Sequence, residues 1–138
     1  QYSVHDGNIE ELASMTFVFL AVDNNAARRM LARGLKEHGV PFIDVGLGML
    51  EVDGKLSGML RVTTSDGQSF DGPVCDDDLP NEYATNIQIA ELNAMNAAMA
   101  VTRWKRHLTF YADTQNEFQS VYMIDRNEIV NGGQAAYD

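Results

Sequence analysis

The segment from Thr16 to Asn25 constrains the fold of this chain more than any other. Residues 16–22 read TFVFLAV, a run without polar alternation that stops abruptly at Asp23-Asn24-Asn25. A short, continuous run of β-favouring apolar residues predicts a strand buried on both faces, as in parallel sheets. The residues that follow have helical character, and Asn24 or Asn25 is a suitable N-cap. Asp23 is therefore expected at the carboxyl end of a parallel strand, where open α/β sheets bind ligands.

Residues 26–38 are expected to form the helix that follows this strand. Apolar side chains recur at helical spacing along one face. Four basic side chains are expected to face water instead: Arg28, Arg29, Arg33 and Lys36. Gly39 marks the end of the helix, and the apolar run of residues 42–50 supplies a second strand. Residues 8–50 are therefore expected to form a parallel strand-helix-strand unit.

The pattern changes after this unit, although residues 1–138 are expected to be a single α/β domain or a fragment of one. The expected segments are antiparallel strands over 51–64, a crossover-like acidic loop over 65–84, a long helix over 85–108 and a closing hairpin over 118–131. Asp53-Gly54 is the turn signal between the antiparallel strands. Thr85 to Gln88 fits a capping box. The middle of the long helix is apolar almost all round, which predicts deep packing.

Composition narrows the classes of function. The chain carries a formal charge of −10, and it has no basic stripe for the phosphate contacts that nucleic-acid binding needs. No apolar run reaches the ~18 residues of a membrane span. The single cysteine excludes an internal disulfide framework and a multi-cysteine zinc site. Because no signal-peptide pattern opens the chain, the cytoplasm is the expected compartment.

Asp23 is the first candidate functional residue. A carboxylate at the end of a parallel strand, beside a helix N-terminus, can hold Mg²⁺ against a phosphate. The alternative is that Asp23, Asn24 and Asn25 only cap the helix, which is a common role for these residue types. The two roles can be divided among the three residues.

Several other residues within apolar segments are weaker indications of a functional site. Asp44 is either a ligand at a strand end or an inward carboxylate with a local partner. Gly46 and Gly48 lack the third glycine of a dinucleotide fingerprint, so a bulge or a close backbone approach is expected there. Glu91, Asn93 and Asn96 must be hydrogen-bonded if they are buried, and a structural role is expected for them.

Cys75 is the only thiol in the sequence. Its acidic neighbours, including Asp76 to Asp78, should raise its pKa, opposite to what a nucleophilic thiolate needs, so a structural role is the expected one. His5, His38 and His107 have no metal-binding spacing and are expected at the surface. The chain has no Walker-type loop, G-x-G-x-x-G, G-x-S-x-G or H-E-x-x-H motif.

The order of these segments resembles the second half of ThiF/MoeB-type adenylation domains, relatives of ubiquitin-activating enzymes. The matching stretches are FVFLAVDNNAARRMLARGLKEHGVPFIDVGLGML, GKLSGMLRVTT, NIQIAELNAMNAAMAVTRWKR and VYMIDRNEIV. The resemblance covers about residues 8–132. It implies the C-terminal half of a Rossmann-like fold, with a parallel strand-helix-strand unit continuing into antiparallel strands and a long packed helix.

The resemblance also implies an activity. Enzymes of this family use ATP and Mg²⁺ to adenylate the C-terminal glycine of a ubiquitin-like or sulfur-carrier protein, and the residue matching Asp23 helps to bind Mg-ATP. The resemblance therefore makes Asp23 the expected metal ligand and, with Asn24 and Asn25, an expected cofactor-binding residue. One of the two asparagines is left to cap the helix. Some members form a thioester or persulfide on a crossover-loop cysteine, a role for which Cys75 is the only candidate here.

The family's glycine-rich nucleotide loop, its ribose-binding acid and its phosphate-binding Arg and Lys precede the matching segment. The chain is therefore expected to be inactive alone and to complete the nucleotide pocket of a larger protein, in which it also supplies carrier-docking and homodimer surfaces. A non-catalytic scaffold or dimerisation module with the same fold is the alternative.

Overall fold

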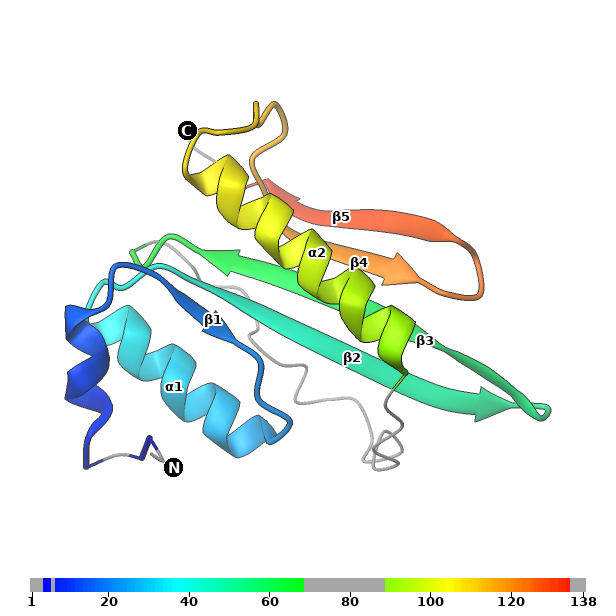
Figure 1. Ribbon diagram of the computed structural model, residues 1–138, viewed down its shortest axis with the longest axis horizontal. Coiled ribbons are helices and arrows are strands. Elements are labelled where there is room, and N and C mark those ends of the chain that lie inside the picture. The colour runs from blue at the N-terminus through cyan, green and yellow to red at the C-terminus, as the bar shows by residue number, and fades with distance from the viewer. Residues whose placement is uncertain (1–3, 6, 69–88, 135–138) are drawn as a thin grey trace. The chain divides into compact units, whose positions relative to one another are not determined.

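The computed structural model describes residues 4–5, 7–68 and 89–134, which form a mixed α/β structure (Figure 1). The strands of this part make a five-stranded mixed sheet in the order β1-β2-β3-β4-β5. Contacts divide the chain into two compact units. Among the described residues, the first comprises residues 4–5, 7–44 and 64–68, and the second comprises residues 45–63 and 89–134.

The first unit contains a 3-10 helix, a strand and a helix, followed by the start of β2. These are η1 (Ile9–Ser14), β1 (Val18–Leu20), α1 (Asn25–Glu37) and β2 (Phe42–Val52). β1 and β2 pair in parallel, with Val18 opposite Phe42 and Leu20 opposite Asp44. The predicted strand-helix-strand unit is confirmed, because α1 connects two parallel neighbours.

The core of the first unit is the apolar face of α1 packed on the two strands. Its buried members are Leu20, Leu31, Ala32, Leu35, Val40 and Phe42. Burial of β1 on both faces was a wrong expectation. Phe19 points away from Leu20 and is 45% exposed, although its ring lies 5.3 Å from the Phe17 ring. Alternate side chains of a strand point to opposite faces, and only the Leu20 face of β1 belongs to this core.

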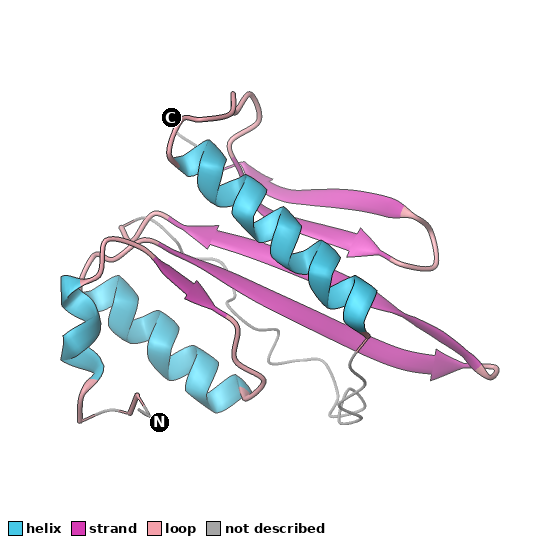
Figure 2. Cartoon of the chain, viewed as in Figure 1, coloured by secondary structure: helices cyan, strands magenta, loops and turns pink. Residues whose placement is uncertain are grey.

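The second unit contains the rest of β2, most of the next strand, two further strands and a helix. These are β3 (Lys55–Ser65), α2 (Ala90–His107), β4 (Glu117–Met123) and β5 (Glu128–Gln134). Strands are magenta and helices cyan in Figure 2. β3 pairs antiparallel with β4, and β4 pairs antiparallel with β5. Asp53 and Gly54, both with positive φ, form the turn between β2 and β3 that the sequence predicts. The closing hairpin is also confirmed.

Two expectations about the long helix are wrong. α2 begins at Ala90, and its N-cap residue, Ile89, accepts no capping hydrogen bond through its side chain. The expected capping box, Thr85 to Gln88, lies outside the described residues. The helix is also not deeply packed all round. Its buried residues are Asn96, Ala100 and Arg103, whereas Ala94 and Val101 are exposed. Alanine is compatible with either environment, so an alanine-rich sequence overstates the width of the buried face.

A close backbone approach involves Gly48, but the glycine that permits it is Gly58 on the neighbouring strand. A Cβ atom added to Gly58 on β3 would overlap the carbonyl oxygen of Gly48 on β2. At Gly46 the nearest atom to an added Cβ is Arg61 Nη2, at 3.3 Å. A flexible guanidinium end can move by a few tenths of an ångström, whereas a paired backbone carbonyl cannot move without disturbing the sheet.

We therefore expect Gly58→Ala to lower the free energy of unfolding by about 1–3 kcal/mol, the usual cost of overpacking. Gly46→Ala is the matched control on the neighbouring strand and should cost less. Urea unfolding of both variants, followed by circular dichroism, checks the order. Equal midpoints for the two variants would contradict the overlap at Gly58.

No helix within the described ranges is long and apolar enough to cross a membrane.

Candidate functional site

The turn between β1 and α1 holds the first candidate functional residue. Asp23 is exposed between the carboxyl end of β1 and the first turn of α1. Asn24 Oδ1 accepts a hydrogen bond of 3.0 Å from the Ala27 amide and is the N-cap of α1. Capping is therefore assigned to Asn24, and the Asp23 carboxylate is not needed for it.

Asn25 is the first residue of α1 and takes part in the same turn. Its Oδ1 accepts a hydrogen bond of 3.2 Å from Arg28 Nη1. The Asn24 carbonyl also accepts the Arg28 amide at 2.9 Å, as the first helical bond of α1. Asn24 and Asn25, both proposed as cofactor-binding residues from the sequence, thus have structural partners that order the turn around Asp23.

Asp44 lies on β2, beside β1, and is fully buried. Of its two expected roles, the inward carboxylate with a local partner is correct, because Asp44 Oδ1 lies 2.8 Å from Arg28 Nε. The expectation that Arg28 faces water is wrong, since its side chain is only 11% exposed. The position of Asp44 inside an apolar run indicated a buried ion pair. The sequence did not indicate which of the four basic residues of the helix is its partner.

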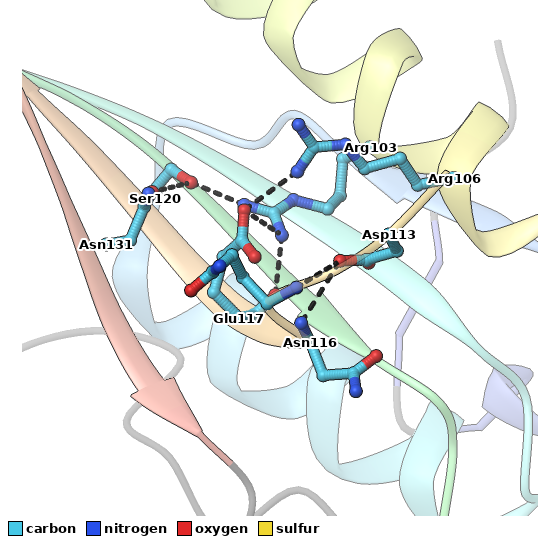
Figure 3. Close-up of polar contacts among 8 residues, drawn as sticks. Arg103, Arg106, Asp113, Asn116, Glu117, Ser120 and Asn131 are labelled. Carbon is cyan, nitrogen blue, oxygen red and sulfur yellow. Dashed lines mark hydrogen bonds and ion pairs between the residues drawn. The ribbon is translucent and has the colours of Figure 1, made fainter. Parts of the chain in front are cut away.

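The second unit contains a larger polar cluster that the sequence did not predict. Figure 3 shows Arg103 and Arg106 reaching from α2 towards Glu117 on β4. Arg103 Nη1 lies 3.2 Å from Glu117 Oε1, and Arg106 Nη1 lies 2.7 Å from the same oxygen. Both Arg103 and Glu117 are more than nine-tenths buried, with side chains 7% and 9% exposed.

Further hydrogen bonds extend this cluster across the closing hairpin. Arg103 donates to the Glu117 carbonyl and to Ser120 Oγ. Ser120 Oγ in turn donates to Asn131 Oδ1 on β5, at 2.7 Å (Figure 3). A chain of contacts thus joins the C-terminal turn of α2 to both strands of the hairpin.

Burial lowers the pKa of the Arg103 guanidinium from its ordinary value, and Glu117 opposes this shift. Arginine nonetheless stays protonated in proteins, so Arg103 acts here as a fixed positive charge that bonds the carboxylate. The cluster has the chemistry of a structural anchor between helix and hairpin. The buried residues of α2 are Asn96, Ala100 and Arg103, spaced four and three residues apart. This helical spacing is the signal by which the sequence could have indicated the buried face.

Asn96, also expected to need partners, is buried and donates to the Gly46 carbonyl at 3.0 Å. Glu91 and Asn93 are exposed. The three histidines are exposed as expected, and His38 Nδ1 lies 2.8 Å from the Gly34 carbonyl near the end of α1. Cys75 lies outside the described residues.

Within residues 4–5, 7–68 and 89–134, no three His, Cys, Asp or Glu side chains gather into a possible metal site. A single carboxylate is compatible with Mg²⁺, because this ion keeps several waters and is often bound by one or two carboxylates and substrate phosphates. Asp23 therefore fits a metal that a nucleotide brings with it, but it does not form a complete cage.

Comparison with known proteins does not assign the chain to a family. No protein-family model matches it, and no curated protein has a matching sequence.

Proposed function

We propose that this chain is part of a ThiF/MoeB-type adenylyltransferase, which uses ATP and Mg²⁺ to activate the C-terminus of a ubiquitin-like or sulfur-carrier protein. In this proposal the chain is the C-terminal half of a Rossmann-like adenylation domain. The observation that carries the proposal is the exposed side chain of Asp23, which lies three residues beyond the carboxyl end of the parallel strand β1 and directly before the N-cap of α1.

Three properties of this position support nucleotide binding. Ligands of open α/β sheets lie outside the carboxyl ends of the strands. The N-terminus of α1 has unpaired backbone amides and a positive dipole end, both of which favour phosphate. Asn24 Oδ1 accepts a hydrogen bond from one of these amides, that of Ala27. The Asp23 carboxylate is therefore available for the cation that accompanies a phosphate.

The role of this chain in the reaction is electrostatic. Attack of the carrier carboxylate on the α-phosphorus forms an acyl-adenylate and expels pyrophosphate, and negative charge develops on the phosphate oxygens. Mg²⁺ supplies offsetting positive charge when it is bound, and Asp23 is the residue here that would hold it. The glycine-rich loop and the phosphate-binding cations would come from another segment.

This proposal is tested with the complete gene product and candidate carrier proteins. We expect exchange of radioactive pyrophosphate into ATP that depends on Mg²⁺ and on a carrier with an intact C-terminal glycine. A carrier lacking that glycine is the matched control. We also expect titration calorimetry to show no micromolar binding of ATP to residues 1–138 alone, and such binding would overturn the proposal of an incomplete pocket.

A second candidate is a non-catalytic scaffold or homodimerisation module. It is favoured by exposed apolar side chains on and after α2, where Val101 is 43% exposed, Leu108 53% and Phe110 68%. A scaffold would form dimers in light scattering, lose them on Val101→Glu, and give no carrier-dependent exchange. Exchange activity in the complete gene product distinguishes the enzyme, because both candidates allow a dimer.

A further inference from the structure

One side chain of the first unit links three segments around the candidate site. Each guanidinium nitrogen of Arg28 has its own partner. Nε faces Asp44 Oδ1 on β2 at 2.8 Å, Nη2 donates to the Val22 carbonyl at 2.5 Å, and Nη1 donates to Asn25 Oδ1 at 3.2 Å. Arg28 thus joins β2 to both ends of the turn that contains Asp23.

The burial of this pair is not explained by stability alone. Asp44 is fully buried and the Arg28 side chain is 11% exposed. Removing two charges from water costs about as much as their attraction returns, so a well-packed apolar pair of similar volume is often equally stable or more stable. What an apolar pair cannot supply is the two hydrogen bonds that Arg28 donates to the turn.

These two bonds lie on either side of Asp23. The Val22 carbonyl precedes it, and the Asn25 side chain follows it after the Asn24 cap. The residue between them is exposed, so its carboxylate is presented to solvent from a backbone held at both ends. Catalytic groups need positions fixed to within about 0.5 Å, which usually requires this kind of support.

We propose that Arg28 and Asp44 are positioning residues for Asp23: their buried pair holds the turn from Val22 to Asn25 in the conformation that presents the Asp23 carboxylate to Mg²⁺ and nucleotide. This inference rests on the function proposed above for Asp23. Asp44 acts through Arg28, whose guanidinium it orients, and neither residue touches the reacting atoms.

The test replaces the pair as a unit. Arg28→Met with Asp44→Leu removes both charges, so no uncompensated buried charge remains and the fold should persist. Arg33→Met with Glu37→Leu is the matched control, because it removes an exposed ion pair of 3.7 Å from the same helix. The first measurement is amide hydrogen exchange of residues 1–138, with Tm recorded for each variant.

We expect amides of the turn and the first turn of α1 to exchange at least about tenfold faster in the Arg28/Asp44 variant, as in locally opened segments. Amides in the middle of α1 should not change, and neither should any amide of the turn in the Arg33/Glu37 control. Unchanged exchange in the turn would overturn the inference. A variant that unfolds is replaced by Arg28→Lys, which keeps a positive charge opposite Asp44. Its single nitrogen cannot reach the three partners that the guanidinium contacts through three separate nitrogens.

The second measurement is the Mg²⁺ dependence of pyrophosphate exchange in the complete gene product. The Arg28/Asp44 variant should raise the half-saturating Mg²⁺ concentration about tenfold, with the KM for the carrier unchanged, since positioning acts on the metal site alone. If the wild type is active and the variant has the same half-saturating Mg²⁺ concentration as the wild type, only the positioning role is overturned. A wild type without exchange overturns the proposed function, and with it the role of Asp23.

Discussion

Asp23→Asn should reduce carrier-dependent pyrophosphate exchange by about 10²–10³-fold, the range found when one preorganised electrostatic group is lost from an active site. The substitution preserves the size of the side chain and exchanges a charged oxygen for a neutral amide. Mg²⁺ prefers hard, anionic oxygen ligands, so the amide holds the metal poorly. Because Asp23 is exposed and Asn24 makes the cap, the fold should not change.

The measurement is the exchange rate at saturating ATP over a range of Mg²⁺ concentrations, with Tm as a check of folding. Glu10→Gln is the matched control, because it removes an exposed carboxylate from η1 in the same unit. We expect the control to keep the wild-type rate. A rate within twofold of wild type for Asp23→Asn would remove Asp23 from the mechanism.

Glu117→Gln should lower the free energy of unfolding by about 3 kcal/mol, at the lower end of the cost of breaking a buried ion pair. The variant leaves the guanidinium of Arg103, which is only 7% exposed, without its carboxylate partner. Ser120 Oγ and the Glu117 carbonyl still accept hydrogen bonds from it, but neither carries a charge. The substitution should therefore weaken the attachment of α2 to the hairpin.

Urea unfolding followed by Trp104 fluorescence measures this effect, since Trp104 lies next to Arg103 on α2. Glu128→Gln removes an exposed carboxylate from the same hairpin and should change stability by less than about 0.5 kcal/mol. Arg106→Gln should cost less than Glu117→Gln, because Arg106 is 33% exposed and water can replace its partner. Equal midpoints for Glu117→Gln and Glu128→Gln would contradict the anchoring role of the buried pair.

Local patterns account for most of the elements. The Asp-Gly turn after β2, the Asn cap of α1 and the parallel pairing of β1 with β2 follow from residues close together in the sequence. The N-terminus of α2 was predicted five residues too early. Its true start at Ala90 follows Ile89, a residue that no capping preference would select.

The environment of each basic residue was less predictable. Arg28 was expected to face water and no strand partner was predicted for Arg103, yet both are buried against carboxylates on strands. In the sequence, Asp44 lies 16 positions after its partner Arg28, and Glu117 lies 14 positions after its partner Arg103. The helical pattern of the sequence indicates on which face of a helix a residue lies. It does not indicate which strand residue packs against that face.

For the candidate site, the sequence alone determined that Asp23 lies between a strand and a helix, because apolar runs, caps and turns are local in their causes. Only the tertiary structure decided that Asp44 is buried and that Arg28 joins it to the turn around Asp23. The physical reason is that a buried charge must find its partner in three dimensions. In an unfolded chain several basic side chains compete for that position, and packing selects one of them.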